Sequence, residues 1–348
     1  MLNLATLSYI IHADATFQLI YEGSPVLING TTDLDRHFHS FSMSVCSNEK
    51  TGDFVFIFKT LVETLEKLGE KIHIDTLVSD ASEAIRNAFL LVFGAGMLII
   101  MCWAHVRRNV VKHLHLVDED YKDEIMVDID ALQLASNNEN FDKAKDLLIK
   151  KWNSKKQNEF INYMKSMWLS SHQNWYEGVA FSTPSHNNGL ESHNLVIKKE
   201  ETFRERMPLP RFIQQCIDSV EKWSKQYANK DREIIITPTI ELQHWTHGYH
   251  WAKSNKQIAT RELGNIIEYY CPVGEQTKVT EEQIKTIQEF RWNTFDQFKK
   301  RASSVWKVTL PSDASNEKWR EGKCTCPFFL KKYMCKHIIG LAIRLKSA

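Results

Sequence analysis

The sequence is poor in cysteine, has no excess of charge of either sign, and lacks a hydrophobic run long enough to cross a membrane. Its seven cysteines are an odd number, and four lie apart from the rest, which does not suit the disulfide framework of a secreted protein. Lys and Arg total 44 against 43 Asp and Glu, so nucleic-acid binding would need local basic patches. The longest apolar run, residues 90–103, is shorter than the roughly 20 residues of a membrane helix.

These shortages point to an intracellular protein with no membrane span. The first residues also lack the basic segment and small-residue cleavage site of a secretory signal, so we expect none. Of the 348 residues, 43% are hydrophobic and 25% are charged, which is ordinary for a globular protein with one large domain or two.

Short β-rich segments dominate the first part of the chain, and helices alternate with strands after them. We predict strands over residues 7–21, 24–30, 37–45, 74–80 and 97–103, with helices over 53–69 and 82–93. Three hairpin-linked strands followed by alternating helix and strand predict an α/β fold: a mixed sheet with helices on both faces, as in a ribonuclease H-like core.

The remaining sequence predicts an interruption of this core and an addition behind it. The core's first part is expected over residues 1–115, and the β signal disappears over 116–182, which we interpret as an all-α insertion. The core is expected to be completed over 183–232 by a segment that carries Glu191. A helical connector over 233–300, with a helix at 281–298, and a small zinc finger over 301–348 complete the predicted organisation.

Four soft metal ligands lie close together near the C-terminus, in the stretch KCTCPFFLKKYMCKHIIG. They are Cys324, Cys326, Cys335 and His337. Three thiolates and one imidazole complete a zinc tetrahedron and leave no position open for chemistry, so we expect a structural Zn²⁺. The spacing CxCx8CxH, with the strand-like SSVWKV ahead of it, resembles the SWIM zinc finger. The alternative is four coincidental ligands in a loop.

Three acidic residues stand out once the core is interpreted as a sheet. Asp14 lies between apolar neighbours in the first strand, where an unpaired charge costs several kcal/mol. Asp80 ends the fourth strand, and the two carboxylates face a common point if these strands are neighbours. Glu191 lies near a helix start beyond the insertion, on a face shared with Lys198. Taken singly, Asp80 also fits a helix N-cap and Glu191 a solvated helix residue.

The blocks DATFQL, VSDASEAIRNAF, MCWAHVRRNV and HNNGLESHN resemble those of the Mutator-like element (MULE) transposase domain, a ribonuclease H-like DDE enzyme. The resemblance covers roughly residues 8–200, and the SWIM-like finger behind it also fits the family's domain order. It implies that Asp14, Asp80 and Glu191 are the catalytic triad. It further implies two Mg²⁺ or Mn²⁺ ions, cleavage of DNA that frees a 3′-hydroxyl, and attack by that hydroxyl on target DNA.

The resemblance also places Cys102 and His105 on the family's CxxH motif. We interpret them as a buried hydrogen-bonded pair that positions the strand end near Asp80, although a core cysteine and a surface histidine fit the spacing equally well. Two basic clusters are candidate DNA contacts, or solvated charge: Arg107, Arg108 and Lys112 follow His105, and Lys198 and Lys199 follow Glu191.

The sequence therefore predicts a nuclear transposase of the Mutator-like class whose partner is DNA. The rival interpretation is a non-catalytic DNA- or chromatin-binding transcription regulator derived from such a transposase. Family members usually carry a DNA-binding zinc domain ahead of the catalytic core, whereas Asp14 lies close to the first residue here, so we expect a truncated or host-retained copy. Whether two copies form a homodimer is left open.

Overall fold

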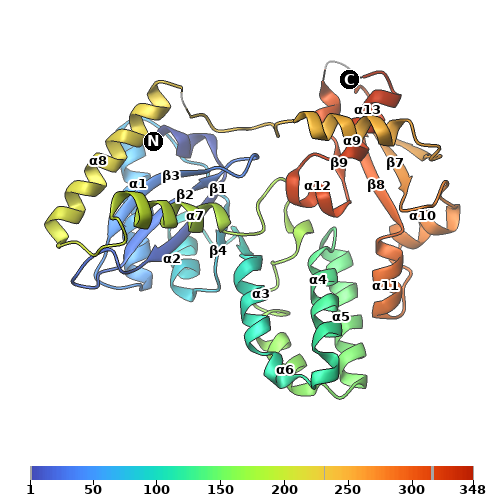
Figure 1. Cartoon of the computed structure of the whole chain (residues 1–348), viewed down its shortest axis with the longest axis horizontal. Coiled ribbons are helices and arrows are strands. Elements are labelled where there is room, and N and C mark those ends of the chain that lie inside the picture. The colour runs from blue at the N-terminus through green and yellow to red at the C-terminus, as the bar shows by residue number, and fades with distance from the viewer. Residues whose placement is uncertain (1, 231, 315–316, 348) are drawn as a thin grey trace. The chain divides into compact units, whose positions relative to one another are not determined.

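The chain divides into two units, each built from two separate stretches of sequence (Figure 1). The first unit comprises Met1–Asn109 and Thr183–Ile236, and the second comprises Val110–Ser182 and Thr237–Ala348. The computed structural model describes residues 2–230, 232–314 and 317–347, with the backbone alone at 301 and 302. The helical insertion and the C-terminal segment thus belong to one unit.

The first unit is built on a five-stranded mixed sheet with the order β3-β2-β1-β4-β5. Strands β1 (Ile10–Thr16), β2 (Val26–Thr32) and β3 (Phe38–Val45) form an antiparallel meander. Strands β4 (Thr76–Ser79) and β5 (Leu98–Met101) follow, and β4 pairs in parallel with β1 on one side and with β5 on the other. The predicted mixed α/β sheet is confirmed, and β1 lies at its centre.

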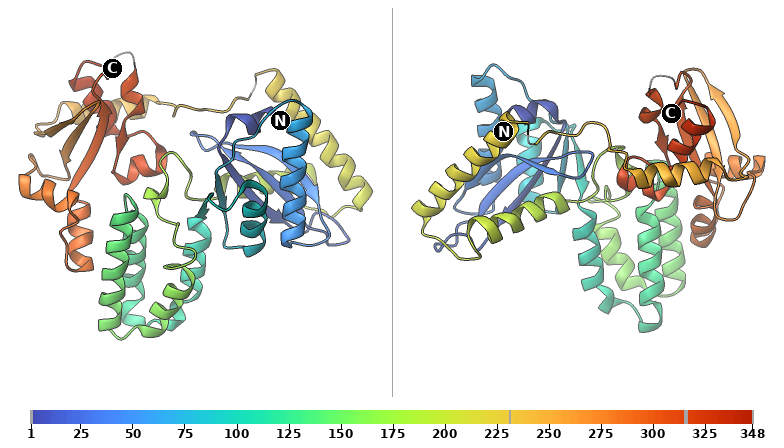
Figure 2. Two further views of the ribbon diagram at one scale, coloured as in Figure 1. Left: turned by 180° about the vertical axis from the view of Figure 1, so that it is seen from behind. Right: turned by 45° about the horizontal axis from the view of Figure 1, so that its top comes forward.

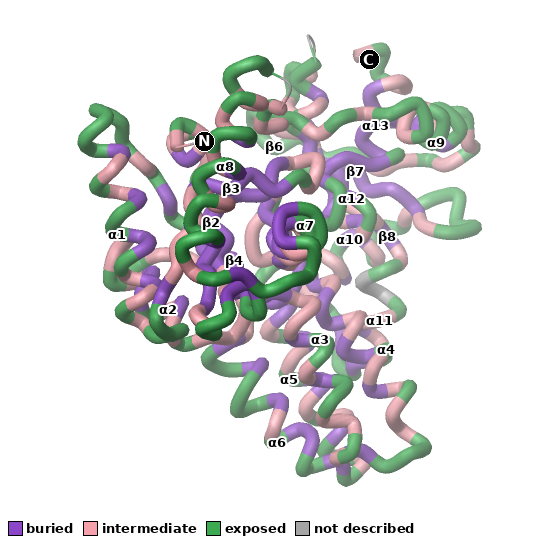
Figure 3. Tube along the Cα trace, turned by 60° about the vertical axis from the view of Figure 1, so that its left-hand side comes forward, coloured by how far each residue is buried: buried purple, intermediate pink, exposed green. Residues whose placement is uncertain are grey.

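Helices cover both faces of this sheet because each face carries apolar side chains. On one face, α1 (Thr51–Lys67) and α2 (Glu83–Phe93) bury Phe58 and Phe89 against the strands. On the other, α7 (Asn188–Val196), its π-helical continuation η5 (Ile197–Glu201) and α8 (Leu209–Ala228) bury their own apolar residues. Figure 2 shows α1 and α8 on opposite sides of the strands, and Figure 3 shows α7 buried along one side only. Two further elements are η1 (Leu2–Leu7) and α3 (Trp103–Lys112), and the last residues of α3, from Val110 on, belong to the second unit.

The second unit begins with the insertion, whose described elements are all helical. Its main helices are α4 (Lys122–Gln133), α5 (Asn138–Ser154) and α6 (Asn158–Met167), and its short turns are η2 (Leu114–Leu116), η3 (Glu119–Tyr121) and η4 (Glu177–Val179). A buried carboxylate joins two of these helices: Asp128 accepts a hydrogen bond from Trp152 Nε1 at 3.0 Å and pairs with Lys151 Nζ at 2.7 Å. Pairing compensates the cost of burying that charge.

A four-stranded antiparallel sheet forms the C-terminal part of the second unit, in the order β6-β7-β8-β9. Its strands are β6 (Ala259–Leu263), β7 (Ile266–Pro272), β8 (Val305–Pro311) and β9 (Lys323–Cys324), and its helices are α9 (Leu242–Ala252), α12 (Pro327–Lys332) and α13 (Lys336–Arg344), with the short turn η6 (Lys318–Glu321). Residues 233–300 are therefore not the helical connector that the sequence predicts, because β6 and β7 form half of this sheet.

The prediction of one continuous helix over 281–298 is also wrong, because the structure has two separate helices there. Helix α10 (Glu281–Gln288) ends before Phe290, whose φ of +48° is left-handed, and α11 (Phe295–Ala302) starts a new direction. The break lets Trp292 leave the helix and pack on Phe298, with ring centroids 5.7 Å apart. None of the described helices is both long and apolar enough to span a membrane.

Candidate active site and candidate metal centre

The first two acids lie at the same edge of the sheet because β1 and β4 run parallel. The last residue pair in their register is His12 with Val78, and Asp14 and Asp80 each lie two residues farther along. Neighbouring strands are about 4.8 Å apart, so the two acids are close along this edge. The condition on which the sequence argument depends, that strands one and four are neighbours, is met.

The sequence allowed Asp80 to be either a site acid or the N-cap of the following helix, and the structure rules out the second role. Ser82 is the N-cap of α2, with its hydroxyl accepting from the Ile85 N–H at 3.5 Å. Asp80 instead accepts the Ser82 N–H at 3.0 Å through Oδ1, which forms a tight turn between β4 and α2. This turn fixes the carboxylate at the strand end.

Glu191 lies in the first turn of α7, and two buried side chains of the sheet region hold the start of that helix. The N-cap of α7 is Asn187, whose backbone carbonyl accepts the Glu191 N–H at 2.9 Å. Its side-chain Oδ1 receives a hydrogen bond from His12 Nδ1 at 2.7 Å, and its N–H donates to Cys102 Sγ at 3.2 Å. The strand of Asp14 and the helix of Glu191 are thereby tied together.

Two further contacts join α7 to this region. Asn194 donates through Nδ2 to Asp14 Oδ2 at 3.4 Å, and His105 Nε2 lies 3.5 Å from Glu191 Oε1. Asp14, Glu191 and Lys198 line one cavity of about 440 Å³. His105 thus contacts Glu191, and Cys102 contacts Asn187, which starts the helix of Glu191. The backbone N–H of Cys102 also donates to the carbonyl of Ser79.

The carboxylates repel one another, which shows that they share one electrostatic environment. Burial, followed by the charges of Asp80 and Glu191, raises the pKa of Asp14 to about 7. A fourth acid, Glu49 in the loop before α1, also raises the pKa of Asp14, and burial and Asp80 raise the pKa of Glu49 itself. The pattern predicts a site that gains from a bound cation.

The candidate DNA-contacting cations lie on two helices. Arg107, Arg108 and Lys112 are exposed on α3, and Lys199 is exposed on η5. Lys198 is half-buried and alone among these five lines the acidic cavity. Its ammonium is therefore the cation best placed to meet a phosphate beside the acids.

We expect that Asn187→Ala destabilises the first unit, because it removes the acceptor of the buried His12 donor and leaves that donor unpaired. Burial lowers the pKa of His12 to about 4, so the ring is neutral near pH 7 and donates a single N–H here. The expected loss is about 1–3 kcal/mol in the free energy of unfolding, measured with urea. Ser192→Ala, on an exposed position of the same helix, is the control. Equal stability of the two variants would contradict the tether.

The second site is the cluster of zinc ligands, which are all buried. The ligand atoms of Cys324, Cys326, Cys335 and His337 lie within 4.8 Å of one another. His337 Nδ1 lies 3.8 Å from Cys324 Sγ and 3.7 Å from Cys335 Sγ. A tetrahedral zinc with bonds of about 2.0–2.3 Å spaces its ligands about 3.5–3.8 Å apart, so the set fits the ion.

Backbone groups and close packing support this cluster. Cys324 Sγ and Cys326 Sγ each accept a backbone N–H at 3.4 Å, from Cys326 and Phe329 respectively. Burial raises the pKa of the Cys324 and Cys335 thiols, so thiolates there require a nearby cation. Helix α13 approaches α9 closely because Gly248 of α9 and Gly340 of α13 have no side chains where the two helices meet. A Cβ on Gly340 would lie 2.4 Å from Trp251 of α9.

Among the described residues, this is the one compact group of three or more His, Cys, Asp or Glu ligand atoms. The acids Asp14, Asp80 and Glu191 do not form such a group, although their charges interact. The sequence therefore located the zinc ligands by spacing alone. It did not single out His12 or Glu49; the signal for His12 was its position two residues before Asp14, on the same face of β1.

Comparison with known families assigns two parts of the chain. Residues 10–109 match the MULE transposase domain, and residues 313–346 match the SWIM zinc finger. The first match includes Asp14, Asp80, Cys102 and His105, and the second includes all four candidate zinc ligands. A comparison with curated proteins gave no match.

Proposed function

We propose that the protein is a DDE transposase of the Mutator-like class, which cleaves and transfers DNA strands with divalent metal ions. The family match over residues 10–109 supports the class. The strand order β3-β2-β1-β4-β5, with three antiparallel strands first and two parallel strands after them, supports a ribonuclease H-like core. The SWIM match and the buried Cys₃His set support a structural zinc in the same chain.

The observation that carries the proposal is the convergence of three acids from distant parts of the sequence. Asp14 lies near the end of β1, Asp80 directly follows β4, the parallel neighbour of β1, and Glu191 returns to them on α7 after the whole insertion. His12 and Cys102 contact Asn187 at the start of this helix, and His105 contacts Glu191. Asn194, on the helix itself, donates to Asp14. A helix held so firmly over a strand end that carries repelling charge indicates a binding site rather than a stabilising one.

The donor set fits Mg²⁺ or Mn²⁺, since both prefer carboxylate oxygen, and Asp14, Asp80 and Glu191 would hold the ions. When bound, two such ions stabilise the attacking and leaving oxygens of a phosphoryl transfer. His105 would orient Glu191, and Asn194 would fix the Asp14 carboxylate through their contact at 3.4 Å. Lys198 would hold a phosphate in the cavity that it shares with both acids.

A nicking assay tests this function. Wild-type protein with Mg²⁺ or Mn²⁺ is expected to nick a terminal-repeat duplex, and Asp80→Asn should lower the rate by about a thousandfold or more, because one oxygen ligand becomes a neutral amide. The nicked fraction is measured on denaturing gels, with retention of zinc as a check on folding. Cleavage that survives Asp80→Asn would remove the enzymatic assignment.

The same assay separates the enzyme from a non-catalytic regulator of DNA or chromatin. The regulator is favoured by one observation: the three acids are not as tightly grouped as the zinc ligands. Wild-type protein that binds the duplex without nicking it would support that second function. Both functions require access to DNA, so we propose that the protein acts in the nucleus.

A further inference from the structure

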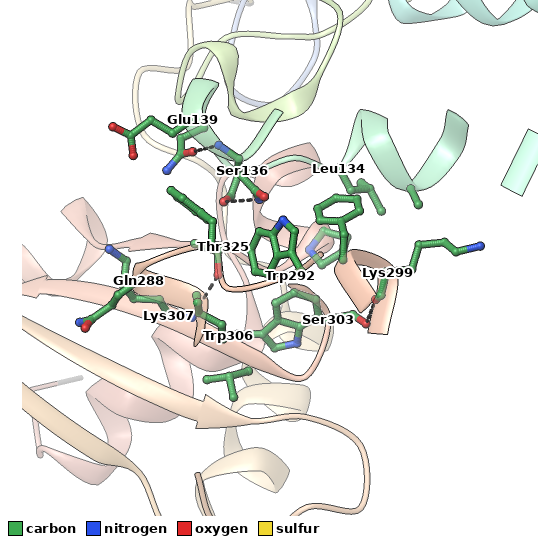
Figure 4. Close-up of a pocket in the computed structure, with 18 of the residues that line it drawn as sticks. Leu134, Ser136, Glu139, Gln288, Trp292, Lys299, Ser303, Trp306, Lys307 and Thr325 are labelled. Carbon is green, nitrogen blue, oxygen red and sulfur yellow. Dashed lines mark hydrogen bonds between the residues drawn. The ribbon is translucent and has the colours of Figure 1, made fainter. Parts of the chain in front are cut away.

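The second unit contains a cavity of about 530 Å³, and Figure 4 shows Trp306 and Lys299 among its lining side chains. Both lysines that line it already have carboxylate partners: Lys299 pairs with Asp128, and Lys307 pairs with Glu268. These cations therefore do not select a ligand. The first unit has a surface, on helix α8, whose side chains indicate a more definite partner.

Helix α8 carries apolar side chains on two of its faces, and one of these faces packs against the sheet. Phe212 and Trp223 belong to the inner face and are buried. Figures 1 and 2 show α8 along the outside of the first unit. A second row of apolar residues lies outside the buried face: Pro210, Ile213, Ile217 and Val220. Ile213 and Ile217 are 45% and 48% exposed.

The spacing of this second row is that of a seam between two helices. Its members follow one another at intervals of three, four and three residues, and Ser224 extends the row by four more. Alternation of three and four residues keeps side chains in line along one side of a helix, where a partner helix packs between them. A single exposed isoleucine needs no explanation, whereas a row at this spacing predicts a second helix over it.

The charges beside the row indicate which helix that is. Arg211 and Asp218 are exposed on the same side of the row, seven residues apart. Lys222 and Lys225, toward the end of the helix, pair with carboxylates of their own chain. If two copies of α8 pack antiparallel, Arg211 of each copy lies opposite Asp218 of the other. A parallel pair would instead place like charges side by side.

We propose that a second copy of this chain binds here, and that the two α8 helices pack antiparallel along this row. In that register Ile213 of each copy lies beside Ile217 of the other, so one two-fold axis forms every contact twice. The row from Pro210 to Ser224 is about 21 Å long at 1.5 Å per residue. An interface of this size is small, so we expect dissociation in the micromolar range. The dimer does not depend on strand cleavage.

Sedimentation equilibrium of the full, zinc-loaded chain at about 1–200 µM tests the dimer. Wild-type protein should approach twice the monomer mass at the upper concentrations. Ile217→Glu should raise the dissociation constant by about tenfold or more, because it places a charge in the seam. Leu91→Glu is the control, since Leu91 is 71% exposed on α2, away from the row, and it should change nothing. A wild type that stays monomeric, or equal dissociation constants for the two variants, would overturn the proposal.

A charge exchange tests the antiparallel orientation and cannot be explained by misfolding. Arg211→Asp alone places two acids opposite each other at both ends of the seam, and should weaken the dimer by about threefold or more. Adding Asp218→Arg to the same chain restores opposite charges in the antiparallel pair, so the double variant should regain the wild-type dissociation constant. A double variant that dimerises no better than Arg211→Asp would contradict this orientation.

Discussion

Cys335→Ser is expected to release the zinc and to unfold the C-terminal part of the second unit. The cysteine is fully buried and is the N-cap residue of α13, the helix that also carries His337. Binding of a structural zinc supplies about 10 kcal/mol or more in small zinc domains, which is comparable to the whole stability of a domain. Zinc content by elemental analysis should fall from one ion per chain to none, and amide exchange over β9, α12 and α13 should accelerate.

Cys216→Ser is the matched control for this result. Cys216 lies on α8 in the first unit, is half-buried, and contacts Met43 Sδ at 3.8 Å rather than a ligand cluster. It should keep the zinc and the exchange protection of α13. A Cys335→Ser protein that still holds one zinc per chain, with unchanged protection, would contradict the assignment of this ligand.

The zinc cluster could be predicted because its information is local. All four ligands lie within fourteen residues, so the spacing alone restricts their geometry. The strand-like SSVWKV ahead of the ligands overlaps β8. The two strands that complete the sheet, β6 and β7, were missed because Arg261, Glu262 and other polar residues of β6 are exposed at the sheet edge and give no alternating pattern.

The acidic centre was predictable only in part, because its contacts join residues far apart in sequence. The sequence placed Asp14 inside the first strand and Asp80 at the end of the fourth, and brought them together only on the condition that these strands are neighbours, as β1 and β4 are. The bond between His12 and Asn187 spans 175 residues, and no periodic pattern encodes such a pair. Glu49 lies in a loop, where its approach to Asp80 follows from the path of the chain into α1. Resemblance to a family supplied what local pattern could not: the choice of Glu191 among many helix acids.

Asp14→Asn is expected to abolish metal-dependent nicking and, at the same time, to stabilise the protein when no divalent metal is added. The amide keeps the shape of the side chain and its contact with Asn194 but removes a charge that Asp80, Glu191 and Glu49 repel. Nicking should fall by about a thousandfold or more, as for the loss of any ligand that acts only through bound metal. The free energy of unfolding, measured with urea at pH 7.5, should rise.

The pH dependence fixes the origin of this stabilisation. The Asp14 carboxyl ionises near pH 4 in the unfolded chain and at about 7 in the folded one, so its ionisation favours unfolding between these values. The stability gained by Asp14→Asn should therefore be smallest near pH 4, grow as the pH rises toward 7, and reach up to roughly 4 kcal/mol above it. With added Mn²⁺, the wild type should become more stable to unfolding than Asp14→Asn, since the ion stabilises only the protein that keeps the Asp14 carboxylate.

Lys198→Gln is the control that separates metal binding from phosphate binding at the same cavity. It should slow nicking but leave the Mn²⁺-dependent stabilisation intact, because an ammonium is not a metal ligand. If Mn²⁺ stabilised Asp14→Asn as much as the wild type, Asp14 would not bind the ion, and its raised pKa would record only burial beside other acids. We expect Mn²⁺ to reverse the order of stability only for variants of Asp14, Asp80 and Glu191. That result would show that the bound metal relieves the repulsion between these three carboxylates.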